Sequence, residues 1–568
     1  MNLQKDLLRL LADTPLADRL EMVSLSGWPR GAVYKTVAAL EREGLVESVP
    51  HASELVAPTR RYCLSADGVQ RLASEEGVGV DELLRERPVS RRWRRILLER
   101  LDAVAVIYRL ASALAGVAFP LRFRWYRAMP MDAAVALPDG RTIAIVRQGL
   151  TSDRTGFGKR IWRLREGPQP AAALLLMPDE VRLRHARGLL HGAGFIRFLA
   201  LERDVAAAGS RARIWRTPSG ATPLGLGEAL SYVRPDGAWP VERPLARRSL
   251  PGPLPAGDGA ERDERMLPAL LKPIEKRALD LVSDWPWITP PHLGDLLGVK
   301  RSRLSEVLQR LGEMGLVLDD VVEGQRRVAV TDRGLALLSH RDRTSLGVAR
   351  RRRSVEPLDH DATLGWRNVS GRSSRQLLRT IDHTDAVHGF LAALATQARE
   401  RSVEVVQFDP PRRASRYFRH DDRLHSVQPD AFGALRRGDD LWPFLLEWER
   451  RAVRPVTMAA RLAPYLRYYA SRRPTDDHGA QPVVLVVFDD ELAANHFLRV
   501  AHEEMGRARV EVPLWVSHRQ LLEREGALGQ GWAQALSRRG ATASWESVAR
   551  SGAAYETHFS SGLGRASI

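Results

Sequence analysis

Cysteine is almost missing from this chain. Cys63 is the only cysteine among 568 residues, so the sequence offers neither a disulfide framework nor a thiolate metal site. A chain without disulfides fits a reducing compartment, and we expect a cytoplasmic protein. Lysine is scarce as well, because only six are present and none follows Lys300.

Long apolar runs and glycine-rich phosphate loops are also absent. The longest apolar run, residues 103–119, is interrupted by Arg109 and is shorter than a membrane span. The amino terminus carries charges inside an amphipathic helix, which is unlike a secretory signal. The missing phosphate loop argues against a motor protein. We therefore expect no membrane contact and no nucleotide-driven activity.

Acidic residues are scarcer than basic ones. The chain holds 69 Asp and Glu against 86 Lys and Arg, which gives a formal charge of +17 and a pI near 10.5. Such a balance is typical of proteins that meet phosphate, although an arginine-rich coding bias produces the same composition. The length predicts about three to five domains.

One segment occurs twice. GVKRSRLSEVLQRLGEMGLV at residues 298–317 repeats the pattern of GWPRGAVYKTVAALEREGLV at residues 27–46, 271 positions earlier. Each copy predicts a helix with one buried stripe, a glycine stop and a strand. An apolar helix and a Thr-Pro pair precede each copy, and a return strand that begins with paired arginines follows it. Three helices and a two-stranded wing predict a winged helix-turn-helix in each copy.

In that fold the third helix presents its solvent face to the DNA major groove, and wing arginines reach phosphates. The first copy offers Arg30, Tyr34, Lys35, Arg60 and Arg61. The second copy offers Lys300, Arg301, Ser302, Arg303, Gln309, Arg310, Arg326 and Arg327. We therefore expect both copies to bind double-stranded DNA and the second to be the better reader. The alternative is that these modules dock proteins.

A larger α/β unit follows each winged helix and is repeated too. Ala105-Val106 matches Ala386-Val387, 281 positions later, and LLLMPDEVRLRH at 174–185 mirrors LVVFDDELAANH at 485–496. The expected domains are a winged helix at 1–79, an α/β domain at 80–248, a linker at 249–264, a second winged helix at 265–340, a flexible basic linker at 341–375, a second α/β domain at 376–535 and a tail at 536–568.

Three acids are expected to converge in the second α/β domain. Strand alternation places Glu447 and Glu449 on one face, where Asp430 on the neighbouring strand joins them. Such carboxylates can hold Mg²⁺, with Asp430 and Glu447 as the expected ligands, and a bound Mg²⁺ can activate water. Without a cation their repulsion needs a counter-ion, for which Arg461 is the best placed. We expect His383 to be a cap or packing residue.

The Pro-Asp strand followed by the acidic strand resembles the PD-(D/E)xK phosphodiesterase superfamily. The resemblance implies a restriction-endonuclease-like α/β fold with Asp430, Glu447 and Glu449 as catalytic residues. The chain departs from it where that family has a lysine, because Glu449 stands at that position. In the first copy Asp132 remains but the strand at 143–148 has no acid, so no metal site is expected there.

The winged helix, His383, the Pro429-Asp430 strand, the LLEWER strand and the closing Gly526 to Trp532 segment together resemble the replication-relaxation family. The resemblance covers residues 274–532 and extends to the first half as a degenerate echo. It implies a DNA-bound, cytoplasmic role in replication or DNA processing of a bacterial plasmid or integrative conjugative element. The implied partners are relaxase or replication proteins of the same element.

Three classes of function remain open. The favoured one is a non-catalytic DNA-binding accessory protein that needs no cofactor. The second is a Mg²⁺-dependent endonuclease that uses Asp430, Glu447 and Glu449. The third is a transcriptional regulator whose α/β domains dimerise or sense a ligand. The oligomeric state stays open, since two winged helices in one chain are able to read both halves of an inverted repeat.

Overall fold

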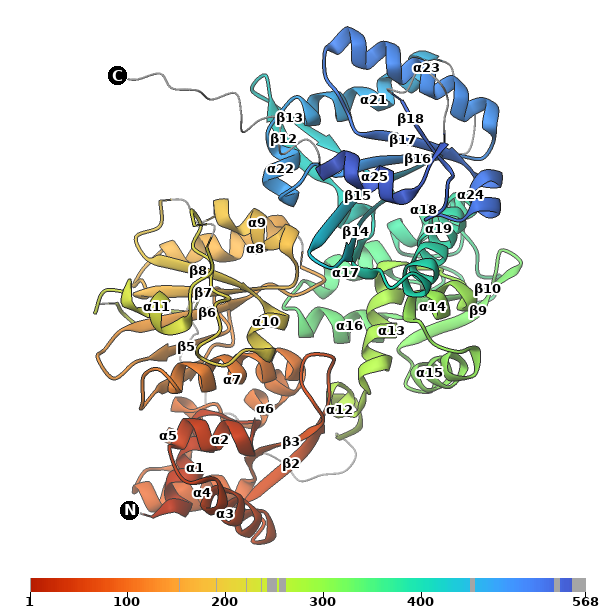
Figure 1. Cartoon of the computed structure of the whole chain (residues 1–568). Helices are drawn as coiled ribbons and strands as arrows, with labels where there is room; N and C mark the ends of the chain where they lie inside the picture. Colours follow the sequence, from red (N-terminus) through yellow and green to blue (C-terminus); the bar gives the residue numbers. More distant parts are fainter. Residues whose placement is uncertain are drawn as a thin grey trace, which may run out of the picture. The chain divides into compact units, whose positions relative to one another are not determined.

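A computed structural model describes residues 2–152, 154–189, 192–220, 222–235, 237–242, 253–254, 262–449, 455–535 and 542–553. Contacts divide the chain into a first unit, Met1–Lys276 with Ala336–Leu346, and a second unit, Arg277–Leu335 with Gly347–Ile568. The chain is a mixed α/β multidomain protein with several sheets, which confirms the expected class (Figure 1). No described helix combines the length and the apolar character that crossing a membrane requires.

The first unit opens with a helical module that ends in an antiparallel hairpin. Its elements are α1 (Leu3–Asp13), β1 (Ala17–Asp18), α2 (Arg19–Ser26), α3 (Arg30–Arg42), β2 (Val46–His51), β3 (Thr59–Leu64) and α4 (Ala66–Glu76). Asp18 and Glu21 start α2 with a capping box, in which each side chain accepts from the other's amide at 2.8 Å. Gly27 ends α2 at a left-handed φ of 69°, a conformation that glycine adopts without strain.

The second helical module repeats this order. Its elements are α13 (Pro273–Asp284), α14 (Pro290–Leu297), α15 (Arg301–Glu313), β9 (Val317–Val322), β10 (Gln325–Val330) and α16 (Asp332–Arg341). Gly298 ends α14 at φ 68°, as Gly27 ends α2. The apolar stripe of α15 is buried as its spacing predicts, with Leu304, Val307, Leu308 and Leu311 facing inward.

A five-stranded sheet forms the rest of the first unit. The elements are α5 (Val80–Glu86), α6 (Arg91–Leu98), α7 (Leu101–Ala115), β4 (Arg122–Trp125), β5 (Ala133–Ala136), β6 (Thr142–Arg147), α8 (Arg154–Trp162), a 3-10 turn (Arg163–Arg165), β7 (Ala172–Met177), α9 (Glu180–Leu189), β8 (Ile196–Leu201), α10 (Glu202–Ala207), α11 (Leu226–Ser231) and α12 (Arg262–Leu270). The strand order is β4-β5-β6-β7-β8, with the first two pairs antiparallel and the last two parallel.

The second unit has a longer sheet, whose first strand pairs follow the same sequence of antiparallel and parallel directions as the first sheet. Its elements are α17 (Leu346–Arg353), α18 (Arg372–Arg379), α19 (Ile381–Glu400), β11 (Glu404–Asp409), α20 (Pro411–Ala414), β12 (Arg416–His420), β13 (Arg423–Val427), β14 (Ala431–Arg437), β15 (Asp440–Glu449), α21 (Pro455–Tyr469), α22 (Arg473–His478), β16 (Val483–Phe488), α23 (Glu491–Ala508), β17 (Leu514–His518), α24 (Arg519–Glu525), β18 (Trp532–Gln534), β19 (Thr542–Ala543) and α25 (Trp545–Ala553). The order is β11-β14-β15-β16-β17-β18-β19, antiparallel twice, then parallel twice, then antiparallel.

Helices cover both faces of the first sheet. Alternate strand residues such as Ile145 and Leu174 pack with α7 in one apolar cluster. The intervening residues, such as Val146 and Ala173, pack with α8 and α9 in another. Because strand side chains alternate between faces, a sheet covered on both sides needs apolar residues throughout its central strands. β6 and β7 are accordingly buried along their whole length.

The two sheets share one pair of hydrogen bonds between an aspartate and the neighbouring strand. An aspartate before the second strand donates its amide to a carbonyl of the third strand and accepts, through its carboxylate, the amide two residues further on. These residues are Asp132, Ile145 and Arg147 in the first sheet, at 2.9 and 2.7 Å, and Asp430, Leu446 and Trp448 in the second, at 2.8 and 2.8 Å. The match supports a duplicated domain and fixes which strand positions correspond.

The expected flexible linker at 341–375 is wrong. This stretch contains α17 and the start of α18. Val355 and Val369 are buried against Trp287 and the β9–β10 hairpin, so apolar contacts order the segment. Of the arginine run that ends α17, Arg350 pairs with Asp332 at 3.0 Å, and Arg353 donates to the Ser283 carbonyl at 2.9 Å. The run is therefore partly engaged within the protein.

Two expected boundaries also move. The second module was predicted to start at 265, but the first unit extends to Lys276, because α12 packs against β2 and α6. The predicted linker at 249–264 lies outside the described residues except for 253–254 and 262–264. The predicted tail at 536–568 is described only at 542–553, where β19 joins the sheet and α25 packs against β15 and β16.

Candidate functional site

The solvent face of α15 carries the predicted DNA-contacting residues of the second module. Lys300, Arg301, Ser302, Arg303 and Gln309 are exposed, and Arg310 is half-buried. Two acids lie on the same face, since Arg303 pairs with Glu306 at 2.6 Å and Gln309 donates to Glu313 at 2.9 Å. The positive charge is therefore concentrated at the first turn, where the helix dipole adds to it.

The first turn of α3 carries less charge than that of α15. Arg30 and Lys35 are exposed and Tyr34 is half-buried. The guanidinium groups of Arg30 and Arg19 lie over the Tyr34 ring, at 5.2 and 5.4 Å from its centroid. Such stacking holds the tyrosine in place and engages part of the basic surface.

The paired arginines of each hairpin do not act alike. Arg60 and Arg326 are exposed, with side-chain exposures of 63% and 58%, whereas Arg61 and Arg327 are buried at 0% and 2%. The prediction that all four reach phosphate is therefore wrong for Arg61 and Arg327. Neighbouring residues of a strand point to opposite faces, so one arginine of each pair enters the core.

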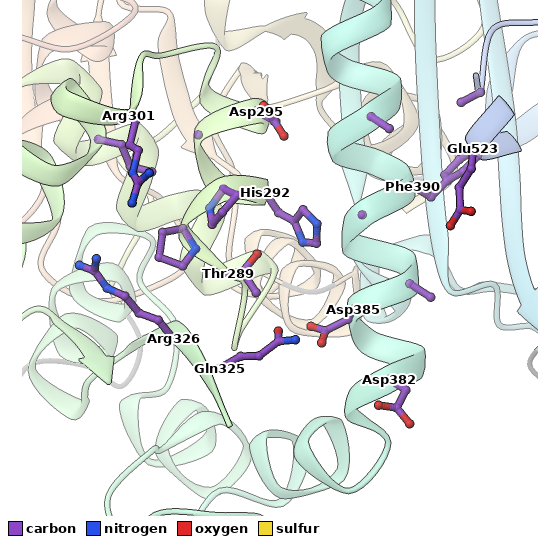
Figure 2. Close-up of a pocket in the computed structure, with 18 of the residues that line it drawn as sticks. Thr289, His292, Asp295, Arg301, Gln325, Arg326, Asp382, Asp385, Phe390 and Glu523 are labelled. Atoms are coloured by element: carbon purple, nitrogen blue, oxygen red, sulfur yellow. The ribbon is translucent and has the colours of Figure 1, made fainter. Parts of the chain in front are cut away.

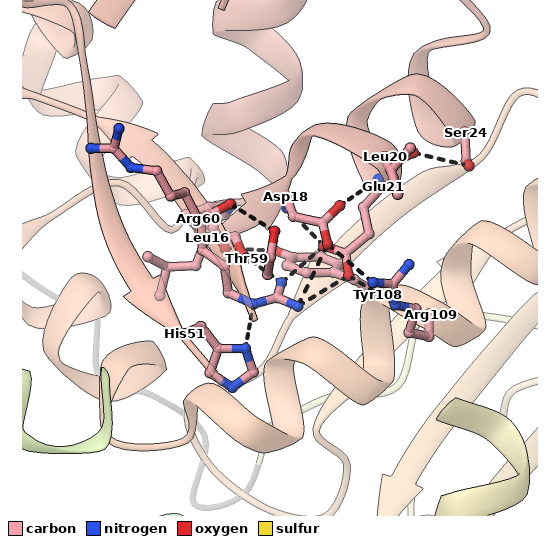
Figure 3. Close-up of polar contacts among 12 residues, drawn as sticks. Leu16, Asp18, Leu20, Glu21, Ser24, His51, Thr59, Arg60, Tyr108 and Arg109 are labelled. Atoms are coloured by element: carbon pink, nitrogen blue, oxygen red, sulfur yellow. Dashed lines mark hydrogen bonds and ion pairs between the residues drawn. The ribbon is translucent and has the colours of Figure 1, made fainter. Parts of the chain in front are cut away.

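Arg61 sits in a closed polar network of the first unit (Figure 3). Its guanidinium pairs with Glu21 at 2.9 and 3.2 Å and donates to the Leu16 carbonyl at 2.9 Å. Its Nε donates to Nδ1 of His51 at 3.1 Å, so Nε2 of His51 carries the proton that Asp102 accepts at 2.8 Å. Burial lowers the pKa of His51, which keeps the ring neutral in this chain of contacts.

Arg327 has an equivalent position in the second unit. It pairs with Asp385 of α19 at 2.6 and 2.7 Å and donates to the Trp287 carbonyl at 3.2 Å. Leu16 and Trp287, whose carbonyls accept from the two arginines, both have left-handed φ values, 68° and 67°. Each buried arginine therefore ties its hairpin to the turn before the second helix of its module. Strand alternation was the signal in the sequence that the arginines differ.

The exposed hairpin arginines are partly neutralised. Arg326 forms two contacts of 2.8 Å with Asp319 on the neighbouring strand. Arg60 lies 3.2 Å from Glu41 of α3. Exposed pairs of this kind are weak and exchange readily with a phosphate partner. The first turn of α15 is thus the strongest anion-facing feature among the predicted residues.

A cavity of about 1530 Å³ lies between the second helical module and the sheet domain of the same unit. Figure 2 shows Arg301 and Arg326 on one side of it and Asp382 and Asp385 on the opposite helix. Asp295, Asp489 and Glu523 line it as well. Its mixed charge is unsuited to a phosphate backbone, which favours the outer face of α15 for nucleic acid.

The three predicted acids line a second cavity, of about 900 Å³. Asp430 accepts from the Trp448 amide and lies 2.9 Å from Nε2 of His383. Glu447 accepts from the Tyr465 hydroxyl, and Glu449 pairs with Arg461, the counter-ion expected from the sequence. His383 is therefore a member of the cluster and not a helix cap, so only the first of its two expected roles is wrong. It lies in the first turn of α19, whose N-cap is Thr380.

Glu447 is the acid with the most perturbed environment. Burial and the neighbouring Asp430 raise the pKa of Glu447 to about 8, against the opposing effects of Tyr465 and Arg461. At neutral pH its carboxyl is therefore protonated. Protonation of Glu447 relieves its repulsion with Asp430 on the adjacent strand.

The cluster fits a Mg²⁺ site poorly. No group of three or more His, Cys, Asp or Glu among the described residues is arranged to hold a metal ion. Glu449 faces Arg461 and one oxygen of Asp430 faces His383, which leaves Asp430 and Glu447 as a two-carboxylate set. Mg²⁺ sites usually combine carboxylates with several waters in octahedral geometry. We derive no metal-dependent step from these residues.

Arg61→Ala is expected to destabilise the first unit by about 3–5 kcal/mol, because it leaves Glu21 buried without its partner. Arg60→Ala, the adjacent exposed position, is expected to cost less than about 1 kcal/mol. Denaturant unfolding of the two variants measures the difference. Equal losses of stability would show that the buried pair does not hold the hairpin.

Glu447→Gln is expected to stabilise the protein at high pH. The folded pKa of Glu447 is above its unfolded value, so stability falls as pH rises from about 4.5 to about 8. Glutamine still accepts from Tyr465 and carries no charge. Calorimetry should show little difference from wild type at pH 5 and a gain of up to about 5 kcal/mol at pH 9. A gain that does not grow with pH would contradict the raised pKa.

Comparison of the chain with family models, with curated proteins and with solved structures found no match in any of the three. What the basic helix and the acidic cavity do must therefore follow from their own contacts and charges.

Proposed function

We propose that the chain is a non-catalytic DNA-binding accessory protein for the replication, relaxation or transfer of a bacterial mobile element, as the replication-relaxation resemblance implies. The observation that carries the proposal is the exposed first turn of α15, where Lys300, Arg301, Ser302 and Arg303 face solvent. A helix N-terminus with basic and hydroxyl side chains suits both phosphates and base edges.

Two finer assignments belong to this proposal. The helical modules are winged helix-turn-helix domains, which the order of three helices, hairpin and closing helix supports. The sheet domains are restriction-endonuclease-like, which the strand senses and the shared aspartate support. In such a module the third helix enters the major groove, and Arg60 and Arg326 contact phosphate from the hairpins.

The partners of this function are duplex DNA first and relaxase or replication proteins of the same element second. The location is the cytoplasm. DNA contact is expected to come mainly from the second module, because Lys300, Arg301 and Arg303 cluster at the start of α15, whereas the first turn of α3 has only Arg30. The first module adds non-specific affinity through Arg30 and Lys35. No cofactor is needed for any of these contacts.

A metal-dependent endonuclease is the second candidate, on one specific observation. Asp430 and Glu447 face one another across adjacent strands in the cavity of about 900 Å³. A divalent ion between them would displace the proton of Glu447 and neutralise the pair. Against it stand the engagement of Glu449 by Arg461 and the absence of lysine after Lys300.

The double variant Arg301→Ala/Arg303→Ala should weaken duplex binding at least about tenfold at moderate salt and reduce the slope of log K against log salt by about two units. Fluorescence anisotropy with a labelled duplex measures both. Arg507→Ala/Arg524→Ala, which removes two exposed arginines elsewhere in the second unit, is the matched control and should leave both values near wild type. Similar losses in the two variants would reject a specific role for α15.

Supercoiled and single-stranded DNA incubated with the protein and Mg²⁺ or Mn²⁺ should remain intact. Gel electrophoresis over several hours is the measurement. Cleavage that disappears in both Asp430→Ala and Glu447→Ala, while the variants still fold and bind duplex, would replace the accessory role by the endonuclease. Cleavage that survives both variants would indicate a contaminating nuclease.

A further inference from the structure

The first unit shows what occupies the aspartate of a sheet domain. The Oδ1 atom of Asp132 accepts from Arg343 at 2.9 Å, and the same guanidinium donates to the Arg127 carbonyl at 3.1 Å. The Arg343 side chain is only 6% exposed. It comes from the segment Ala336–Leu346, which belongs to this unit although it begins within α16, the last helix of the second helical module. An arginine from a distant segment thus fills the site.

Neighbouring contacts hold that arginine in place. Asp342, the preceding residue, accepts from the Thr151 amide at 2.9 Å and lies 3.2 Å from Arg147. Arg160 covers the other oxygen of Asp132. The carboxylate is therefore surrounded by guanidinium groups, which hold its pKa well below the usual range despite burial.

The second unit keeps the same aspartate in an open cavity. Asp430 makes the same two backbone contacts as Asp132, so the third-strand positions correspond. Val146 of the first sheet becomes Glu447, and Gln148 becomes Glu449. The Oδ1 atom of Asp132 contacts Arg343, whereas the Oδ1 atom of Asp430 contacts His383 at 2.9 Å, and the cavity of about 900 Å³ is lined by Asp430 and Glu447. The second copy therefore has more acid and more space than the first.

Among the described residues that line this cavity, carboxylates outnumber guanidinium groups by one. Its described lining includes three carboxylates, from Asp430, Glu447 and Glu449, and two guanidinium groups, from Arg379 and Arg461. His383 is the remaining titratable imidazole beside Asp430. One monovalent cation would balance the set when all three acids are ionised. A phosphate group carries the same sign as this excess of carboxylates, which disfavours a nucleic acid backbone as the occupant.

We propose that the cavity around Asp430 and Glu447 binds a guanidinium group, as Asp132 binds that of Arg343, and that an arginine of a partner polypeptide supplies it. The planar guanidinium donates to two carboxylates at once, which a compact ammonium ion does less well. A volume of about 900 Å³ is larger than one arginine side chain needs, and leaves room for flanking residues of a peptide. The site is separate from α15 and does not depend on DNA binding.

The test is calorimetric titration of the full chain with N-acetyl-arginine amide and with the peptide acetyl-Gly-Gly-Arg-Gly-Gly-amide. The expected Kd lies in the millimolar range for the single residue, and tenfold lower for the peptide. The citrulline analogue, which is neutral, and the lysine analogue should bind at least about tenfold more weakly.

Asp430→Asn and Glu447→Gln should each raise the Kd at least about tenfold, while Glu491→Gln, an exposed acid on α23, should not change it. Binding of the single residue as tight as the peptide would support the guanidinium site but assign it to free arginine. Absence of binding up to about 50 mM, or equal binding of citrulline, would overturn the proposal. So would Mg²⁺ binding at micromolar Kd that Asp430→Asn abolishes.

Discussion

A guanidinium removed from water must find a carboxylate, and in this protein that requirement shapes both helical modules. Arg61 and Arg327 are buried in their hairpins, and each is satisfied by one acid and by the carbonyl of a residue with left-handed backbone. An unpaired buried charge costs several kcal/mol, so these contacts fix the hairpin against the turn before the second helix. The third helix of each module lies in the chain between that turn and the hairpin. In the second module its basic first turn is exposed to solvent.

The same requirement explains why half of the hairpin arginines are unavailable to DNA. A strand that places one arginine in solvent places its neighbour in the core. The partners of the buried pair come from different elements in the two units, Glu21 of α2 in one and Asp385 of α19 in the other. Both units therefore have a buried arginine that donates to the carbonyl before the second helix. The acid that neutralises this arginine comes from a different helix in each unit.

Much of the fold was predictable because it rests on local patterns. The glycine stops at Gly27 and Gly298, the buried stripe of α15 and the acidic strand β15 all follow from spacing within one segment. Features that depend on distant partners were missed. The β12–β13 hairpin, the packing of residues around Val369 and the contact of His383 with Asp430 need the tertiary structure, as does the burial of Arg327. Alternation alone would have separated Arg60 from Arg61.

The two sheet domains have the same strand framework but different surroundings for the shared aspartate. In the first, apolar Val146 and the guanidinium groups of Arg160 and Arg343 close the site around Asp132. In the second, Glu447 stands at the equivalent position and the cavity remains open. The first copy is closed by its own side chains, and the second leaves a cavity that the proposed guanidinium ligand can enter.

DNA recognition by α15 can be tested by site-specific crosslinking, because the chain has a single cysteine. Cys63 is buried and its thiol pKa is raised by burial, so a cysteine placed on the surface can be labelled selectively. Ser302→Cys on α15 and Glu491→Cys on α23, each carrying a photo-crosslinker, are irradiated with duplex DNA. The account predicts crosslinks from position 302 that added salt suppresses, and few from position 491. Equal crosslinking from both positions, or none from position 302, would contradict DNA recognition by α15.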